Sequence, residues 1–145
     1  MKHLLLWLLI GVIGVSSCTK EGIIRRKEDR LIGAWVFDKV FYKRDNALFR
    51  DNITHEYHND VVEFFPDYTA AYDDFSLRSV FAGEWSIIAD EDVDDLEIFV
   101  DAVFYDFLNR EDFFLFGSID RLNRNKLNLE ASDRNGKFTF RLRRL

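Results

Sequence analysis

Two histidines three residues apart, His55 and His58, are the side chains of this sequence best suited to binding a metal ion. They stand in the segment His-Glu-Tyr-His, and Asp60 follows shortly after. On a β-strand, residues three apart face opposite sides, so the two imidazoles would not reach one metal ion. In a turn they would, but a catalytic zinc site requires three protein ligands in a cleft. We therefore interpret both histidines as surface residues of a polar loop and predict no metal site.

The acidic run DEDVDDLE at residues 90–97 is a second candidate for chemistry. Carboxylates at positions 90, 92 and 94 have the alternate spacing of a calcium-binding loop. Asp95, however, occupies the position where such a loop needs a glycine for its sharp turn. We predict a solvated turn between two strands, with a cation site as the alternative.

No residue pattern indicates catalysis or a bound cofactor. The single cysteine, Cys18, lies near the amino terminus, and no serine stands in a Gly-x-Ser-x-Gly setting. Without a second cysteine, neither an internal disulfide nor a pair of cysteine metal ligands can form. We predict that the protein is not an enzyme and requires no cofactor.

Residues 1–17 have the properties of a secretory signal peptide. Lys2 supplies a positive charge, residues 4–15 are uncharged and apolar, and small residues close the segment. The apolar run is about a dozen residues, whereas a membrane-spanning helix needs roughly 20. The closing Val-Ser-Ser-Cys resembles a bacterial lipobox. That resemblance implies that Cys18 is acylated and becomes the first residue of the mature chain.

The lipobox implies an envelope protein whose membrane partner is reached through a lipid anchor. Several acyl chains bind a membrane firmly, whereas a single chain binds only marginally. Thr19, rather than an aspartate, follows the cysteine, which by resemblance favours sorting to the outer membrane. Many surface-exported lipoproteins of Bacteroidetes type carry an acidic run after the cysteine, and this chain does not. The periplasmic and surface faces both stay open.

Charge limits the partners of the mature chain. A formal net charge of −6 argues against nucleic acid, whose binding requires a basic face. Residues 18–30 are predicted as the lipidated cysteine and a tether, a solvated linker that ends in a short helical turn. Fully extended, a dozen residues reach roughly 40 Å. As an alternative, Arg25, Arg26 and Lys27 would lie on anionic lipid head groups.

Residues 31–145 are predicted to form one all-β domain. Apolar residues alternate with polar ones over 127–131 and again over 138–142, with Asn135-Gly136 between them as a turn able to adopt positive φ. This pattern predicts a hairpin. No long apolar period of 3.6 residues occurs, so a large helix is not expected. Further strands are predicted at residues 34–43, 62–64, 69–72, 79–88, 96–105 and 113–122.

About eight short strands suggest an antiparallel up-and-down meander closed into a barrel, because closure removes exposed sheet edges. An open sandwich is the alternative. Two motifs bear on this choice: Gly33 and Trp35 open the first strand, and Gly83 and Trp85 repeat the spacing about 50 residues later. Glycine permits a close backbone approach, and each tryptophan is expected to plug one end of the barrel.

These motifs resemble the lipocalin superfamily, and more closely the small lipocalin-like lipoproteins of Bacteroidetes type, over residues 31–145. Such proteins open with Leu-x-Gly-x-Trp, carry a phenylalanine-containing hairpin and repeat Gly-x-Trp in mid-chain. Tyr68 departs from the pattern, since the hairpin turn of the family commonly has glycine there. The Thr-Asp-Tyr motif of larger lipocalins is also not clear in this chain.

A closed barrel makes a specific prediction about Arg144. The first and last strands of an up-and-down barrel pair antiparallel, so the start of one lies beside the end of the other. Alternation places Arg144 on the same face as Phe138, Phe140 and Leu142. We predict that Arg144 stacks on Trp35, a cation–π contact of about 0.5–2 kcal/mol, as lipocalins show by resemblance. In the alternative, Arg144 frays into solvent.

Two functional classes fit this barrel, and an enzyme or enzyme inhibitor has no residue-level support. The resemblance favours non-catalytic binding of a small apolar ligand, because an eight-stranded barrel holds either its own side chains or one small ligand. Fifteen phenylalanines suit either outcome. The alternative is a filled barrel that serves as a rigid platform for envelope proteins. Its partner surface would include the outward set of the strand at 96–105, either Phe99, Val103 and Tyr105 or the residues at 96, 98 and 100.

Overall fold

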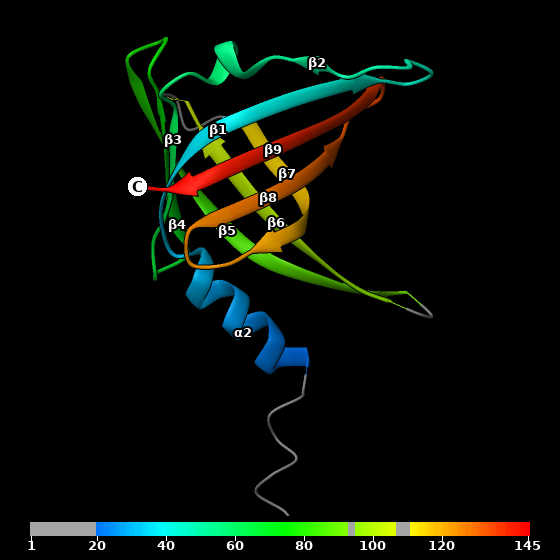
Figure 1. Cartoon of the computed structure of the whole chain (residues 1–145). Helices are drawn as coiled ribbons and strands as arrows, with labels where there is room; N and C mark the ends of the chain where they lie inside the picture. Colours follow the sequence, from blue (N-terminus) through cyan, green and yellow to red (C-terminus); the bar gives the residue numbers. More distant parts are fainter. Residues whose placement is uncertain (1–19, 93–94, 107–110) are drawn as a thin grey trace, which may run out of the picture.

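A computed structural model describes residues 20–92, 95–106 and 111–145 of the chain. Its strands form a closed antiparallel up-and-down barrel, with the helix α2 at one end (Figure 1). The elements are α2 (Lys20–Leu31), β1 (Gly33–Arg44), β2 (Asp51–Asn52), the 3-10 helix η2 (Thr54–Tyr57), β3 (Val61–Phe64), β4 (Thr69–Asp74), β5 (Ser79–Asp92), β6 (Asp95–Tyr105), β7 (Glu111–Leu122), β8 (Lys126–Ser132) and β9 (Gly136–Arg144).

The barrel closes through the pairing of β1 with β9. Each barrel strand from β3 onward pairs with the next along the chain, and β1 pairs with β3 on one side and β9 on the other. The β1–β9 ladder runs from Trp35 opposite Arg144 to Arg44 opposite Gly136. The predicted barrel is therefore confirmed, and the open sandwich is excluded. All the strands expected from the sequence are present, while the short strand β2 was not anticipated.

The predicted hairpin is confirmed in β8 and β9, but its turn differs from our expectation. Neither Asn135 nor Gly136 has a φ in the left-handed region. The carboxylate of Asp133 instead accepts a hydrogen bond from the Asn135 amide at 2.8 Å. Gly136 is required by packing, because a Cβ atom there would lie 2.3 Å from the Lys43 carbonyl oxygen of β1.

The turn between β3 and β4 contains the unusual residue Tyr68, at φ 64°. Its amide donates a hydrogen bond to the Phe65 carbonyl at 3.2 Å, after a Pro-Asp pair that suits a type I turn. A left-handed φ is costly for a side chain larger than glycine. The tyrosine ring compensates by packing on Trp85, with ring centroids 5.4 Å apart. This contact explains how the chain tolerates tyrosine where glycine is expected.

The segment predicted as a tether forms the helix α2. The expectation of a solvated linker with only a short helical turn at its end was therefore wrong, because the helix spans nearly the whole segment. Leu31 is fully buried and Ile24, two turns earlier on the same face, packs against the core. Charged residues surround this apolar pair and hide the period in the sequence. The helix spans about 18 Å. Among the described residues, no helix combines the length and apolar character needed to cross a bilayer.

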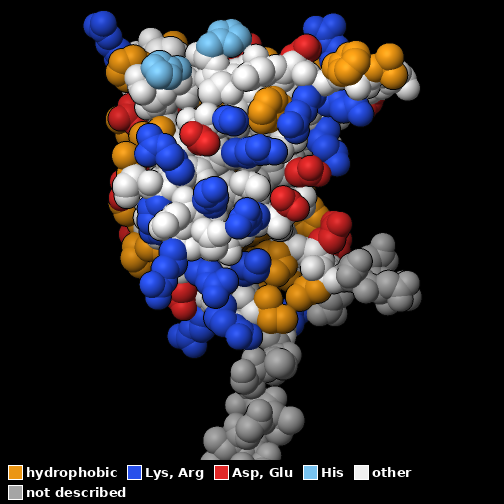
Figure 2. Space-filling model, in the orientation of Figure 1, with side chains coloured by type: hydrophobic (Ala, Val, Ile, Leu, Met, Phe, Trp, Pro, Cys, Tyr) orange, Lys and Arg blue, Asp and Glu red, His pale blue; other side chains and the backbone are white. Residues whose placement is uncertain are grey.

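Alternation along each strand separates a buried interior from a charged exterior. The fully buried side chains include Trp35, Phe64 and Phe104. Figure 2 shows that Lys and Arg side chains gather over β1, β9 and β8, the strands at the front of Figure 1. The barrel therefore positions apolar groups inside and a basic face outside.

Candidate ligand-binding cavity

One end of the barrel is closed around Trp35, at the start of β1. The indole nitrogen of Trp35 donates a hydrogen bond to the Leu31 carbonyl at 2.7 Å, which ties the strand to the end of α2. The Arg144 guanidinium carbon lies 4.5 Å from the centroid of the Trp35 ring. The predicted cation–π contact is confirmed, and Arg144 does not fray into solvent.

Arg144 also joins three segments at this end of the barrel. Its guanidinium donates hydrogen bonds to the carbonyls of Ile32 at 2.8 Å, Arg30 at 2.6 Å and Arg124 at 2.7 Å. Gly33 makes room for it, because a Cβ atom there would lie 2.3 Å from the Arg144 Nη1 atom, and φ is +124°. The glycine of the first Gly-x-Trp motif is therefore required by both backbone conformation and space.

The second Gly-x-Trp motif lies at the same end. The Trp85 indole nitrogen donates to the Phe65 carbonyl at 2.9 Å, and its ring meets Phe64 at 5.5 Å between centroids. Phe64 pairs with Gly33, which places both tryptophans near α2. A Cβ atom on Gly83 would lie 2.2 Å from the Val103 carbonyl oxygen of β6. The two motifs thus close one end of the barrel together.

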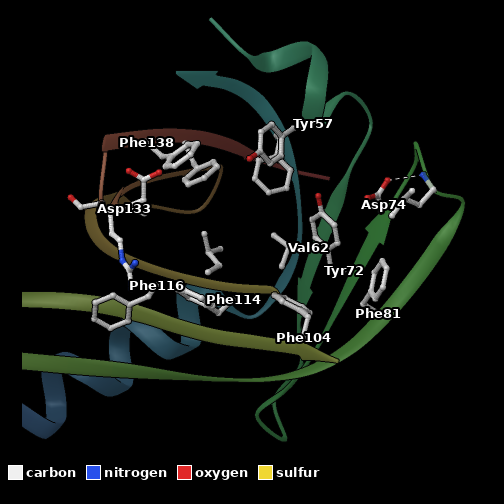
Figure 3. Close-up of a pocket in the computed structure, with 17 residues that line it drawn as sticks. Tyr57, Val62, Tyr72, Asp74, Phe81, Phe104, Phe114, Phe116, Asp133 and Phe138 are labelled. Atoms are coloured by element: carbon white, nitrogen blue, oxygen red, sulfur yellow. Dashed lines mark hydrogen bonds between the residues drawn. The ribbon is translucent and has the colours of Figure 1, made fainter. Parts of the chain in front are cut away.

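The opposite end holds a cavity of about 730 Å³ (Figure 3). Leu77 from the β4–β5 turn, Tyr57 from η2 and Arg134 from the β8–β9 turn mark this end. The volume lies in the range of roughly 300–1,000 Å³ that is typical of small-molecule sites. Aromatic side chains dominate its wall: Phe37, Tyr57, Tyr72, Phe81, Phe104, Phe114, Phe116, Phe138 and Phe140.

The aromatic side chains of the wall support one another. Phe37 meets Tyr72 at 6.2 Å and Phe140 at 5.9 Å between ring centroids, both edge-on. Tyr57 meets Phe140 edge-on at 5.8 Å, and Tyr72 meets Phe104 at 5.8 Å. Such pairs stabilise ring positions by about 0.5–1.5 kcal/mol each. These contacts join Phe37, Tyr57, Tyr72, Phe104 and Phe140 into one connected set of rings.

Tyr72 of this wall forms a buried polar pair with Asp60. Asp60 is 2% exposed, and its carboxylate accepts a hydrogen bond from the Tyr72 hydroxyl at 2.5 Å. The Phe75 amide donates to the other carboxylate oxygen at 3.0 Å. Burial, together with the hydrogen bond to Asp60, raises the pKa of Tyr72. The pair keeps the hydroxyl of Tyr72 protonated and fixes its ring against the cavity.

The cavity is open to solvent between β7 and β8. Pairing of these strands ends at Ser118 opposite Glu130, close to the end of β8, whereas β7 continues outward to Glu111. Phe114 and Phe116 of this part line the cavity although they are 73% and 44% exposed. Asp133, in the neighbouring turn, accepts a hydrogen bond from a tyrosine hydroxyl of β1 at 3.3 Å. The opening thus combines aromatic rings with a few polar groups.

The other candidate residues do not gather into a site. His55 and His58 are exposed, in and just after η2. Within the described ranges, no three His, Cys, Asp or Glu side chains are placed to hold a metal ion. β5 runs to Asp92 and β6 starts at Asp95, so most of the acidic run lies on paired strands, not in a twelve-residue calcium loop. Cys18 lies outside the described residues.

The burial of β6 shows which of its two alternate apolar sets faces outward. Its alternate residues Val100, Ala102 and Phe104 are buried, so Phe99 and Val103 face the exterior, where both are half-buried. Tyr105, also half-buried, follows an irregularity in the β6–β7 register.

The cavity itself was not predicted from the sequence as a set of residues. Alternation indicated Phe138 and Phe140 as inward, but it did not indicate that Tyr57 and Tyr72 from distant segments meet them. The aromatic content of these segments was a signal that they could line a cavity. The cross-strand register was needed to tell which of the rings face one another. Comparisons of the chain with protein-family models, curated proteins and solved structures gave no significant match.

Proposed function

We propose that this protein is a lipid-anchored, lipocalin-like envelope protein that binds a small apolar ligand without catalysis. The observation that supports it is the open, aromatic-lined cavity of about 730 Å³. A barrel filled by its own side chains would leave no such space. Trp35 and Trp85 close the other end, so a ligand enters between β7 and β8.

The chemistry of the wall defines the ligand class. Nine aromatic rings and the aliphatic side chains of Val62, Leu77 and Leu115 favour an apolar body with flat or elongated shape. The polar groups at the opening, Ser132, Asp133 and Arg134, suit a single hydrogen-bonding head that remains near solvent. We therefore expect an amphipathic small molecule rather than a fully apolar one.

Extraction and mass spectrometry of molecules that copurify with the protein test this proposal. A reproducible lipid or pigment in near-stoichiometric amount supports it. Ala131 lines the cavity, whereas Ala82 is exposed on the outer face of β5. The Ala131→Trp variant should lose the ligand and the Ala82→Trp variant should keep it. Equal ligand content in both variants, or an empty parent protein that binds no hydrophobic probe, would contradict the proposal.

The lipid anchor rests on the sequence of residues 1–18 and has its own test. Intact-mass analysis of protein from the membrane fraction should give a chain that begins at Cys18 and carries acyl chains. The Cys18→Ser variant should leave the membrane fraction. An unmodified amino terminus in the parent protein would exclude the anchor and would leave ligand binding unaffected.

A second candidate function is an interaction platform for envelope proteins. It is favoured by the exposure of Phe114 and Phe116 at the opening of the cavity, where Phe99 of the outer face stacks on Phe116 at 5.2 Å between ring centroids. Exposed apolar patches commonly mark partner surfaces. A photo-crosslinking residue in place of Phe116 should capture one defined envelope protein if this function holds. The same residue in place of Lys137 serves as the control.

A further inference from the structure

The outer face of β1, β7, β8 and β9 carries a shallow hollow of about 400 Å³. Its lining includes one carboxylate, Asp38, and the amide of Asn128. Most of the other lining side chains are cationic: Lys39, Arg121, Lys126, Arg141 and Arg143. We name these five residues the basic cluster. Four of the five lie on β1, β8 and β9, the strands over which Lys and Arg side chains gather in Figure 2, on a chain whose formal net charge is −6.

The strand register places like charges directly opposite each other in the basic cluster. Lys39 of β1 is opposite Arg141 of β9, and Arg143 of β9 is opposite Lys126 of β8. Like charges at directly opposite positions destabilise a sheet. The chain has 26 acidic residues against 20 basic ones, so composition did not force this arrangement. The cluster therefore opposes the stability of the barrel instead of supporting it.

Two β-bulges determine the positions of Lys39 and Arg121 in this register. One lies between Phe37 and Lys39, and without it Asp38 would be opposite Arg141. Another lies between Ile119 and Arg121, and without it Asp120 would be opposite Asn128. Each bulge thus removes an aspartate from the row of paired residues and puts a cation in its place. Bulges commonly redirect side chains beside functional sites.

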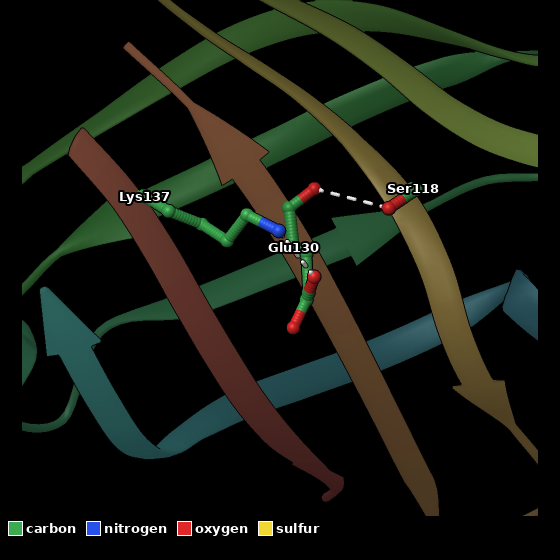
Figure 4. A network of polar contacts seen from close by, with 3 residues as sticks. All are labelled: Ser118, Glu130 and Lys137. Carbon is green, nitrogen blue, oxygen red and sulfur yellow. Dashed lines mark hydrogen bonds and ion pairs between the residues drawn. The ribbon is translucent and has the colours of Figure 1, made fainter. Parts of the chain in front are cut away.

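Outside the hollow a further like-charge pair, Lys43 of β1 opposite Lys137 of β9, has an acidic partner. Lys137 of β9 forms an ion pair with Glu130 of β8 at 3.0 Å, and the Ser118 hydroxyl donates to the Glu130 carbonyl at 3.4 Å (Figure 4). In the part of the chain that the structure describes, no residue of the basic cluster forms an ion pair. A cation–π contact orients the side chain of Arg141, whose guanidinium carbon lies 5.5 Å from the centroid of the Phe41 ring.

We propose that the hollow binds an anion that carries phosphate groups. Arginine presents two N–H groups to two phosphate oxygens, lysine adds a point charge, and the Asn128 amide adds a neutral donor. Bound phosphate neutralises the like-charge pairs. The anion therefore removes the repulsion that destabilises the barrel when the hollow is empty. The site is separate from the apolar cavity, because Arg141 and Arg143 face outward while Phe140 and Leu142 face inward. It is independent of the ligand proposed there.

Calorimetric titration of the purified protein with pyrophosphate at low ionic strength tests this site. Arg141→Gln and Lys126→Gln should each weaken binding about tenfold, since a charge-assisted hydrogen bond is lost. Lys137→Gln removes the same charge from the same face, outside the hollow, and should change the affinity less than about twofold. Urea denaturation should show that Lys126→Gln is no less stable than the parent without ligand. Equal weakening in all three variants would overturn the proposal.

Vesicle binding separates a free phosphate compound from a lipid head group. The Cys18→Ser full-length chain is used, so that acyl chains cannot carry the protein to the membrane. Binding to phosphatidylcholine vesicles that contain phosphatidic acid, lost in Arg141→Gln and kept in Lys137→Gln, identifies a lipid head group. Pyrophosphate binding without vesicle binding identifies a soluble ligand. If neither pyrophosphate nor the phosphatidic acid vesicles bind, the hollow is not a phosphate site.

Discussion

Replacing Arg144 by alanine gives the sharpest test of how the barrel closes. The side chain contributes the cation–π contact with Trp35 at 4.5 Å and hydrogen bonds to three carbonyls. Two of the acceptors, the carbonyls of Arg30 and Arg124, are exposed, so water replaces those bonds at little cost. The Ile32 carbonyl is partly buried and loses its donor.

The expected loss follows from these contacts. A hydrogen bond from a charged donor contributes about 1.5–3 kcal/mol when it is shielded from water. The cation–π contact adds about 1 kcal/mol, and the two exposed bonds add about 0.5 kcal/mol together. Because the bond to the Ile32 carbonyl is only partly buried, it is placed at the lower end of this range, and we expect Arg144→Ala to lower the free energy of unfolding by about 3 kcal/mol. For a domain of this size, that loss corresponds to a melting temperature roughly 10 °C lower.

Urea denaturation followed by tryptophan fluorescence measures this loss, with Arg143→Ala as the matched control. Arg143 is the neighbouring residue of β9, is exposed and faces Lys126, so its removal should change stability by less than about 0.5 kcal/mol. Arg144→Lys should recover little, because one ammonium group cannot reach three carbonyls. Equal urea midpoints for Arg144→Ala and Arg143→Ala would refute the reasoning.

Three further predictions concern the backbone and the cavity wall. Gly83→Ala should lower the free energy of unfolding by about 2–3 kcal/mol in urea denaturation, since the new Cβ atom meets the backbone carbonyl of Val103. At Tyr68, the glycine variant should be more stable than the alanine variant by about 1 kcal/mol, because both lose the ring and only alanine keeps the left-handed strain; equal urea midpoints would exclude strain. Burial and the hydrogen bond to Asp60 raise the pKa of Tyr72, so above about pH 10 the unfolded chain loses this proton first. Urea midpoints should therefore fall with rising pH there, and less steeply in Tyr72→Phe; identical slopes would contradict this.

The strands were predictable because each shows a local pattern of alternating apolar and polar residues between turn residues. Alternation over 126–142 gave the β8–β9 hairpin, and the two Gly-x-Trp motifs gave the closed end. The contact of Arg144 with Trp35 was also predicted, but only after a closed barrel had been assumed. Helix α2 was underestimated, because its apolar contacts with the core come from one pair, Ile24 and Leu31, and the hydrogen bonds from Trp35 and Arg144 to its last carbonyls leave no pattern in the sequence.

The sequence by itself determined the all-β class and the positions of the strands along the chain, because side chains on one strand alternate whatever surrounds them. Only the tertiary structure decided whether the phenylalanines fill the barrel or line a cavity, since volume depends on all strands together. It also decided which charges face each other: the bulges beside Asp38 and Asp120 shift the register by one residue. A shift of one residue changes every cross-strand neighbour, and no pattern within a single strand records it.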